Sequence, residues 1–552
     1  MVAEETQREA ASADRGTGGT ARTGRARTAH RPAANTAWRA LAAAGSGLAQ
    51  LLALPPYGLW WLGPLSAALL AYAVMGTRMR RAAWLGLVSG AALMVPLLQW
   101  QVVFGTDVWL VIAAAESAYF VPMAMGISCV TRLRGWPVWT AALWVLQEAV
   151  RARFPLGGFP WGKLAFAQPD TPFSGYAAWG SSALVTFMVA LSGALLLAVV
   201  LRLVRDRGGA VAPTAAALAA TAAVLAAGMV LPAIGAPRHD HTATVGLVQG
   251  NVPGAGEMNI LGERMQVLDN HVEGVHTLAE QVRSGAKARP DLVVLPENAS
   301  DIDAYTDAEA AEMISAAARD IGVPLLFGIT KYSKGGAERE IRSVVWGPEN
   351  GPGDHYTKRY IVPFGEYIPF RDFFTRFVDR LDQVGSDAVP GTRPGALELG
   401  DTTVAAAICF DVAFDRPVRD SVAAGGQILV VPTNNANYNF TGQSDQQLAI
   451  TQLRAVEHGR PAVIASTSGV SAVVTADGTV TYRSPEAEPA VHVAELPAMT
   501  GLTPATRLGA APEAALGAIA AGTLLAGAAV GRRSRARPTA QEAPSAPDTD
   551  KP

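Results

Sequence analysis

Cysteine and charge are both scarce in this chain. Among 552 residues there are two cysteines, Cys129 and Cys409, and 17% of the residues are charged. Two distant cysteines cannot build a disulfide framework or a metal cluster, so we expect no metal centre. Half of the residues are hydrophobic, which is too apolar for an ordinary soluble enzyme. The arginines of the first half lie between apolar stretches rather than on one face with aromatic residues, so we expect no nucleic-acid partner.

The two halves of the chain differ in charge. Residues 1–235 carry 18 Lys and Arg against 9 Asp and Glu, whereas residues 236–552 carry 27 against 38. Residues 1–36 consist mainly of Ala, Thr, Gly and Arg, a composition that cannot bury enough apolar surface to fold. We therefore predict a disordered arm there, and a second disordered segment at 532–552. The arm does not read as a cleaved signal peptide, because the first apolar segment starts late and many more follow.

Apolar windows recur from Trp38 to Ala233, and one more follows near the end of the chain. A helix needs roughly 20 apolar residues to cross a bilayer. On this measure we predict a polytopic α-helical membrane domain of about eight spans, seven within 37–235 and a last transmembrane helix at 507–531. The predicted spans lie near 38–54, 57–76, 83–104, 108–130, 136–152, 176–201, 211–233 and 508–530.

The arginines predict how these spans are oriented. They gather in alternate joints and in the tail, and the positive-inside rule places such segments in the cytoplasm. We therefore expect a multi-pass protein of the cell membrane, with both termini cytoplasmic and residues 236–506 on the extracytoplasmic side. The arginines concerned are Arg78, Arg80, Arg81, Arg132, Arg134, Arg202, Arg205, Arg207, Arg532, Arg533, Arg535 and Arg537.

Residues 236–506 read as a folded α/β domain. Short, continuously apolar runs alternate with amphipathic stretches, which favours strands that are covered on both faces by helices. Expected strands are 242–250, 291–297, 323–332, 343–351, 404–408, 427–435 and 461–474, and expected helices are 260–284, 307–321 and 444–458.

Three chemically capable side chains end apolar strands in this region or follow them closely. They are Glu297 in "LVVLPEN", Lys358 in "HYTKRY" and Cys409 in "VAAAICF". Sites in α/β sheets gather at the carboxyl ends of strands, so the three can converge. Singly, Glu297 could neighbour a helix N-cap, Lys358 could be a solvated surface cation and Cys409 a core filler. Together they supply a base, a cation for developing negative charge and a nucleophile.

In this order, Glu297, Lys358 and Cys409 resemble the Glu–Lys–Cys triad of the nitrilase superfamily. With the pattern of spans, the chain from about 38 to 530 resembles the membrane-bound apolipoprotein N-acyltransferase family. The most specific segments are "KRYIVPFGEYIP" (358–369) and "GGFPWGKLA" (157–165). The resemblance implies a nitrilase-like α/β sandwich as the catalytic domain, over 236–506.

The resemblance also implies roles for individual residues. Cys409 would be the acyl-accepting nucleophile, Glu297 the general base, and Lys358 the cation that stabilises the oxyanion. Glu366 would orient the lysine and the base, and Trp161 resembles an aromatic residue of a loop near the site.

Three positions depart from the family pattern. Phe410 and Asp411 stand where many relatives have tyrosine and then glutamate. Met258 stands where some relatives carry tryptophan. These differences leave the triad whole, but they bear on how substrates are positioned and on which lipid is preferred.

The implied substrates are a phospholipid acyl donor and a diacylglyceryl apolipoprotein acceptor, joined through a cysteine thioester, with no metal or organic cofactor. Two alternatives use the same features differently: a membrane-tethered nitrilase-type amidase with water as acceptor, and a transporter or scaffold with a degenerate outer domain. A papain-like pair of Cys409 with His355 or His458 is a further possibility, although neither histidine lies in a supporting motif.

An aromatic segment follows Lys358. It places Phe364, Tyr367, Phe370, Phe373, Phe374 and Phe377 among arginines. The spacing 370, 373, 374, 377 suits the apolar face of a core helix. It equally suits an amphipathic lid over 366–380 that dips into the outer leaflet and admits acyl chains to Cys409. Both interpretations stay open at this point.

Overall fold

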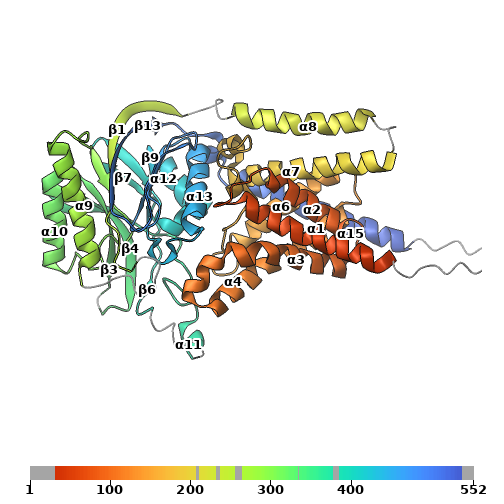
Figure 1. Cartoon of the computed structure of the whole chain (residues 1–552), viewed down its shortest axis with the longest axis horizontal. Coiled ribbons are helices and arrows are strands. Elements are labelled where there is room, and N and C mark those ends of the chain that lie inside the picture. Colours follow the sequence, from red (N-terminus) through yellow and green to blue (C-terminus); the bar gives the residue numbers. More distant parts are fainter. Residues whose placement is uncertain are drawn as a thin grey trace, which may run out of the picture.

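The computed structural model describes residues 31–206, 211–231, 237–254, 264–333, 335–376 and 384–536. Helices form one half of the elongated molecule, and strands with flanking helices form the other half (Figure 1). Most of the predicted arm and tail, together with Met258 and Phe377, lies outside the described residues.

Each predicted apolar segment is helical along most of its length. The helices are α1 (Arg31–Ala53), α2 (Leu62–Val74), α3 (Met79–Leu97), α4 (Thr106–Ala118), α5 (Phe120–Val130), α6 (Trp136–Arg151), α7 (Ala177–Asp206), α8 (Val211–Val230) and α15 (Ala511–Ala536). Three details differ from expectation. Helix α1 begins inside the predicted arm, the expected span 108–130 is divided into α4 and α5 at Tyr119, and α7 has a kink at Gly180 and Ser181.

The helical half has the character of a membrane domain. Two helical stretches, Thr106–Val130 and Ser174–Val204, are long and apolar enough to cross a membrane, and three shorter apolar helices accompany them. Large apolar side chains also face outward, which favours a lipid environment over water. They include Trp38, Leu41, Trp84, Val111, Leu203, Met229 and Leu525. The count of eight spans remains a prediction.

The other half contains two sheets rather than a single sheet covered on both faces. The first has the order β13-β1-β2-β3-β4-β5 with β6 beside β4, and the second has the order β12-β11-β10-β9-β8-β7. The strands are β1 (Arg238–Gln249), β2 (Leu292–Val294), β3 (Leu325–Tyr332), β4 (Glu338–Gly347), β5 (Gly351–Thr357), β6 (Asp387–Ala388), β7 (Ala396–Leu399), β8 (Thr402–Ala406), β9 (Ile428–Thr433), β10 (Ala462–Ser466), β11 (Ala472–Val474), β12 (Val480–Arg483) and β13 (Ala490–Thr500).

The two sheets pack face to face over an apolar layer to which both contribute, for example Leu247 and Val294 from one sheet and Val404 and Val430 from the other. Helices α9 (Gln266–Arg283) and α10 (Ala308–Ile321) cover the outer face of the first sheet. Helices α12 (Asp415–Ala423) and α13 (Gln443–His458) cover the second. This is the sandwich that the resemblance implied, and parallel pairs β1–β2–β3 and β8–β9–β10 form the centres of its sheets.

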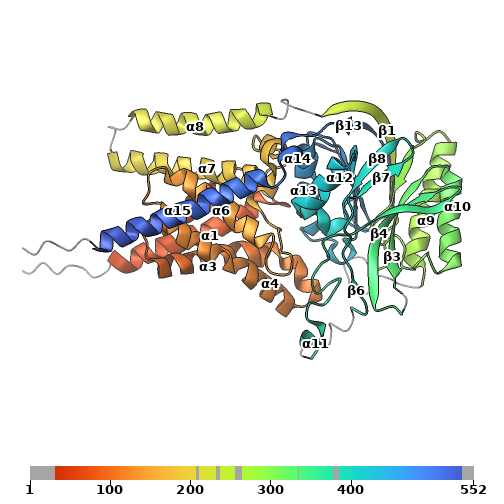
Figure 2. The ribbon, with the colours of Figure 1, turned by 180° about the vertical axis from the view of Figure 1, so that it is seen from behind.

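The two halves share one apolar core. A single cluster runs from helices of the membrane half, through Leu97 and Trp161, to Phe410 and Ile450 of the sandwich. Figure 2 shows α13 and the short helix α14 (Pro504–Leu508) at this junction, between the second sheet and the helical half. The carboxyl-terminal end of β8 therefore lies beside the membrane half.

Candidate active site

Glu297, Lys358 and Cys409 come together from three strand ends. Glu297 follows β2 by three residues, Lys358 immediately follows β5, and Cys409 opens the short 3₁₀ turn after β8. Gly328 on β3 allows the segment that carries Glu297 to lie close against this strand, because a Cβ atom at position 328 would lie 1.9 Å from the carbonyl oxygen of Pro296. The sequence-based expectation that the three strand ends converge agrees with this arrangement.

Lys358 lies between two carboxylates. Its Nζ donates to Oε1 of Glu297 at 2.8 Å and to Oε1 of Glu366 at 2.6 Å. The second oxygen of each carboxylate accepts a backbone N–H, from Asn434 at 3.0 Å for Glu297 and from Val362 at 2.8 Å for Glu366. Because Lys358 and Glu297 are both buried, these bonds fix the ammonium in one position.

Cys409 occupies a constrained position beside this pair. Its φ is +49°, in the left-handed region that non-glycine residues rarely adopt, and such strain gathers at functional sites. Glu297, Lys358 and the Thr433 side chain all influence the pKa of its thiol, so these groups surround it. The residue as a whole is partly exposed, although its thiol is buried.

The charges of the site oppose spontaneous ionisation of the thiol. Burial raises the pKa of Cys409 to about 12, and the negative charge of Glu297 adds to this effect against the influence of Lys358. Burial also raises the pKa of Glu297, in spite of the neighbouring ammonium. Burial alone would lower the pKa of Lys358, but the carboxylates of Glu297 and Glu366 raise it well above its usual value. The lysine therefore stays charged, and the thiol needs a base to react.

Asp411 joins the cysteine turn to the lysine segment. Its fully buried carboxylate accepts from the Tyr356 hydroxyl at 2.8 Å, from the Tyr360 N–H at 2.8 Å and from the Ile408 N–H at 3.2 Å. Tyr356 and Tyr360 flank Lys358, and Ile408 precedes Cys409 in the chain. The carboxylate consequently fixes the spacing between the nucleophile and the cation.

Phe410 and Trp161 form an aromatic wall next to Cys409. Their rings are stacked with centroids 6.4 Å apart, and both are buried. Trp161 also contacts Trp100 at 5.7 Å, and Trp100 contacts Tyr438 at 4.9 Å. The wall combines residues of both halves, so the membrane half forms part of the surroundings of the thiol.

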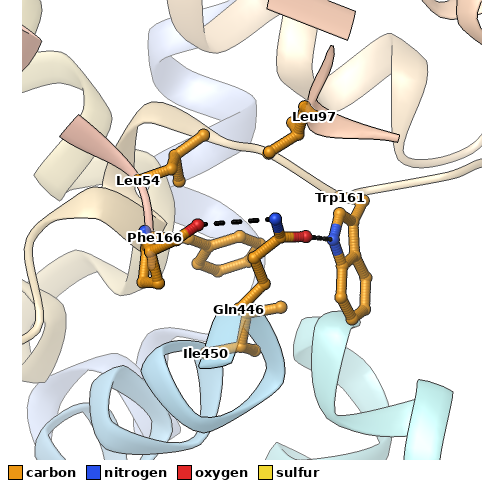
Figure 3. A pocket seen from close by; sticks show the side chains of 8 residues that line it. Leu54, Leu97, Trp161, Phe166, Gln446 and Ile450 are labelled. Atoms are coloured by element: carbon orange, nitrogen blue, oxygen red, sulfur yellow. Dashed lines mark hydrogen bonds between the residues drawn. The ribbon is translucent and has the colours of Figure 1, made fainter. Parts of the chain in front are cut away.

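A very small cavity lies behind Trp161 (Figure 3). Leu54, Leu97, Phe166 and Ile450 line it, and the Gln446 side chain crosses it, accepting from Trp161 Nε1 at 2.6 Å and donating to the Pro55 carbonyl at 3.4 Å. These contacts tie α13 to the loop after α1 and to the loop that carries Trp161. The cavity is a packing gap, and Cys409 is not among the residues that line it.

Sequence reasoning missed several residues of this site. Thr433, Asn434 and Tyr438 surround the triad, and Tyr356 and Gln446 support its neighbours. The polar cluster "PTNNANYN" (432–439) after an apolar strand was the available signal, because it also follows a strand end in a sheet.

In the aromatic segment after Lys358, Phe364 and Tyr367 are half-buried, whereas Phe370 and Phe373 are exposed. Helix α11 is one turn long (Arg371–Phe374), and it projects from the molecule close to the junction of the halves (Figure 1). Phe370 is 75% exposed and Phe373 58% exposed. The alternative of a core helix is therefore wrong for these two side chains.

The histidine alternative gains no support. His458 is fully buried and its Nδ1 pairs with the Thr506 hydroxyl at 2.8 Å. His355 lies on β5, and among the described residues no hydrogen bond joins either histidine to Cys409.

Comparison with known proteins identifies the family of the chain. A family model described as carbon-nitrogen hydrolase matches residues 244–505, and one described as apolipoprotein N-acyltransferase N-terminal domain matches residues 46–195. The sandwich and its Glu–Lys–Cys arrangement thus define a domain of the carbon–nitrogen hydrolase class. An apolipoprotein N-acyltransferase of Mycolicibacterium smegmatis is 38% identical over 493 residues, covering 86% of this chain and 82% of that protein. The chain belongs to the apolipoprotein N-acyltransferase family.

Further relatives show the same pattern. An apolipoprotein N-acyltransferase of Azotobacter vinelandii is 30% identical over 508 residues, covering 88% of this chain and 94% of that protein. Among solved structures, an amidase from Nesterenkonia sp. is 20% identical, covers 48% of this chain and 92% of its own, and has a TM-score of 0.34.

Proposed function

We propose that the protein transfers an acyl chain from a membrane phospholipid, through a thioester on Cys409, to the α-amino group of the N-terminal diacylglyceryl-cysteine of apolipoproteins. Membership of the family supports the reaction class. The observation that carries the residue assignment is the hydrogen-bonded cluster of Glu297, Lys358 and Glu366, whose charges act on the thiol of Cys409.

In the first step Glu297 takes the proton from the thiol as Sγ attacks the carbonyl carbon of the donor ester. Negative charge develops on the carbonyl oxygen, and the ammonium of Lys358 stabilises it. The intermediate then collapses with cleavage of the carbon–oxygen bond. Glu297 returns the proton to the departing oxygen, lysophospholipid leaves, and Cys409 holds the acyl chain as a thioester.

In the second step the free α-amino group of the acceptor attacks the thioester carbonyl. Glu297 takes a proton from the attacking nitrogen, the carbon–sulfur bond breaks, and the thiol recovers the proton. Glu297 acts as base twice, while Glu366 and Asp411 are positioning residues that hold Lys358 and the cysteine turn.

The membrane-tethered amidase is less well supported. The matches extend through the membrane half as well as the sandwich. An enzyme that hydrolyses a soluble amide would not need the membrane half. The transporter alternative is weaker still. Glu116 and Glu148 are the main acids available for an ion path, and both have structural partners. Glu116 pairs with Arg151 at 3.0 Å, and Glu148 accepts from the Leu164 N–H and the Thr186 hydroxyl.

For the domains, we propose the boundaries expected from the sequence: a membrane domain at 37–235, a catalytic domain at 236–506 outside the cytoplasm, a last transmembrane helix at 507–531, and cytoplasmic termini. A reporter fused after Arg207 should then give a cytoplasmic signal, and one fused near Gly335 an extracytoplasmic signal. A cytoplasmic signal near Gly335 would contradict the topology and the leaflet from which the donor comes.

We also propose that the aromatic segment beginning at Glu366 is the lid through which acyl chains reach Cys409. The exposure of Phe370 and Phe373 and the position of α11 near the junction support this role. Aromatic side chains at a membrane–water interface favour partial insertion.

The thioester is the decisive test. Purified protein incubated with phospholipid alone should acquire an acyl group on Cys409 that hydroxylamine removes, and Cys409→Ala should abolish it. Cys129→Ala is the matched control, because Cys129 lies on α5, where its thiol contacts Met79. Addition of a diacylated lipopeptide should discharge the thioester and yield a triacylated peptide by mass spectrometry. Acylation that persists in Cys409→Ala would overturn the assignment.

A further inference from the structure

A second, larger cavity of about 250 Å³ lies at the junction of the two halves. The end of α6 and the loop after it form one side with Arg153 and Lys163, and α12 forms the other with Arg416 and Arg419. The kink of α7 and the start of α15 close it. The cavity is therefore built by both halves.

An aromatic layer separates this cavity from Cys409. Tyr360 and Phe414 line it, and their rings are stacked with centroids 3.8 Å apart. Phe414 in turn packs edge-to-face on Phe410, at 5.0 Å. The cavity is thus a neighbour of the reaction site rather than a part of it.

Positive charge exceeds negative charge around the cavity. Of the lining residues, Arg153 pairs with Glu513, and Lys163 with Asp415. Asp420 is shared by three guanidinium groups, at 3.0, 3.4 and 2.9 Å, those of Arg359, Arg416 and Arg419. The lining residues and their ion-pair partners comprise six basic and four acidic side chains: Arg153, Lys163, Arg359, Arg416, Arg419 and Arg454, against Asp415, Asp420, Glu457 and Glu513.

Lys163 supplies a second and independent sign of a missing partner. Its side chain is 4% exposed. Among the described residues its ammonium makes one hydrogen bond, to the Ser182 hydroxyl at 3.1 Å, and a cation–π contact with the Phe166 ring, 5.6 Å from the ring centroid. The ion pair with Asp415 spans 3.8 Å, which is beyond hydrogen-bond distance. A buried ammonium has three N–H donors, and leaving donors unused in a buried site is costly.

We propose that this cavity binds the phosphodiester of a phospholipid headgroup, with Lys163, Arg416 and Arg419 as its cationic partners. A phosphodiester carries one negative charge and several acceptor oxygens. It can therefore pair with the excess positive charge of the lining and accept hydrogen bonds from the Lys163 ammonium. A membrane lipid is favoured over a soluble anion because the apolar helices α6, α7 and α15 run from the cavity into the membrane half, where acyl chains can lie against them.

The test measures binding and does not depend on turnover. Full-length Cys409→Ala protein in detergent is examined by native mass spectrometry with a diether phosphatidylglycerol, which cannot donate an acyl chain. The combined substitution Arg416→Gln and Arg419→Gln should weaken its binding roughly tenfold, because each basic side chain near a lipid surface contributes attraction. Lys163→Met should weaken it as well.

Two controls make the result specific. Arg283→Gln with Arg319→Gln removes the same charge from α9 and α10, at the end of the sandwich remote from the membrane half, and should leave binding unchanged. A diether glycerol without phosphate should bind equally to all variants. Unchanged phosphatidylglycerol binding in the Arg416/Arg419 variant would overturn the proposal, as would displacement of the lipid by millimolar inorganic phosphate, which would assign the site to free anions. Because the protein tested lacks Cys409, failure here leaves the proposed reaction untouched.

Discussion

The indole nitrogen of Trp161 donates a 2.6 Å hydrogen bond to the side-chain carbonyl of Gln446. Trp161 belongs to the loop after α6 in the membrane half, and Gln446 to α13 of the sandwich. The same indole ring stacks on Phe410, the residue that follows Cys409. Trp161 therefore joins the two halves and also forms part of the wall of the site. A substitution there should lower both the unfolding free energy and the acylation rate.

Trp161→Phe should keep the stacking on Phe410 and lose the hydrogen bond. We expect a loss of about 1 kcal/mol in unfolding free energy and a modest fall in acylation rate. Trp161→Ala should cost about 3–5 kcal/mol, because it also leaves a cavity in a buried aromatic cluster. Thermal unfolding in detergent and single-turnover acylation measure the two effects. Gln446→Ala, made in the wild-type protein and in the Trp161→Phe protein, completes a double-mutant cycle. Additive effects on unfolding free energy would show that the two residues are not coupled.

The acylation rate should fall on the acid side with a midpoint above 4.5, the ordinary pKa of a glutamate. Burial raises the pKa of Glu297, and the protonated carboxyl cannot accept the thiol proton, so activity is lost as pH decreases through that raised value. Because burial raises the pKa of Cys409 to about 12, no alkaline rise from thiol ionisation is expected at pH values well below that pKa. Single-turnover acylation across pH measures this.

Glu297→Gln is the control for the pH profile. Its residual rate should be very low and should rise with pH, because only thiolate formed without the internal base can react. An unchanged acid limb in this variant would show that another group is the base.

Asp411→Asn should weaken both the fold and the reaction. The carboxylate accepts from the Tyr356 hydroxyl and from the N–H groups of Tyr360 and Ile408. An amide nitrogen in place of one oxygen would face donors, at a cost of about 1–3 kcal/mol. Tyr356→Phe removes a single bond and should cost about 1 kcal/mol. Unfolding and acylation are measured together, and Asp411→Asn protein with wild-type acylation would remove the positioning role.

Phe370→Ser combined with Phe373→Ser should leave thermal stability unchanged, because both side chains are largely exposed. Acyl transfer from phospholipid vesicles should slow several-fold, whereas transfer from a short-chain donor dissolved in detergent should not, since that donor does not need a lid at the bilayer surface. Tyr332→Ser, at another exposed aromatic residue, is the control. Equal rates from both donors would contradict the lid proposal.

The sequence was informative where function depends on residue type and on periodicity. Long apolar windows predicted helices, and polar residues at the ends of apolar runs predicted the meeting of Glu297, Lys358 and Cys409. It was less informative where a feature depends on tertiary contacts. The stack of Trp161 on Phe410 joins residues from different halves, so no local pattern announced it.

Short strands were missed for a related reason. β5 (Gly351–Thr357) contains Gly, Pro and Asp, which have poor strand propensity, and pairing with β4 determines its conformation instead. The division of strands between two sheets was likewise hidden, because continuous apolar runs suit either a doubly covered sheet or a sandwich.

Two carboxylates around one ammonium leave the Glu297–Lys358–Glu366 cluster with a net negative charge. Once lysophospholipid has carried away the thiol proton, the thioester form keeps that charge. A peptide α-amino group has a pKa of about 7.7–8.0, so at neutral pH it arrives mostly as a cation. The cluster attracts this cation, which gives one proton to solvent before the free amine attacks, whereas water, being neutral, receives no such attraction. On the proposed mechanism, this charge should favour aminolysis over hydrolysis before any acceptor-specific contact is made.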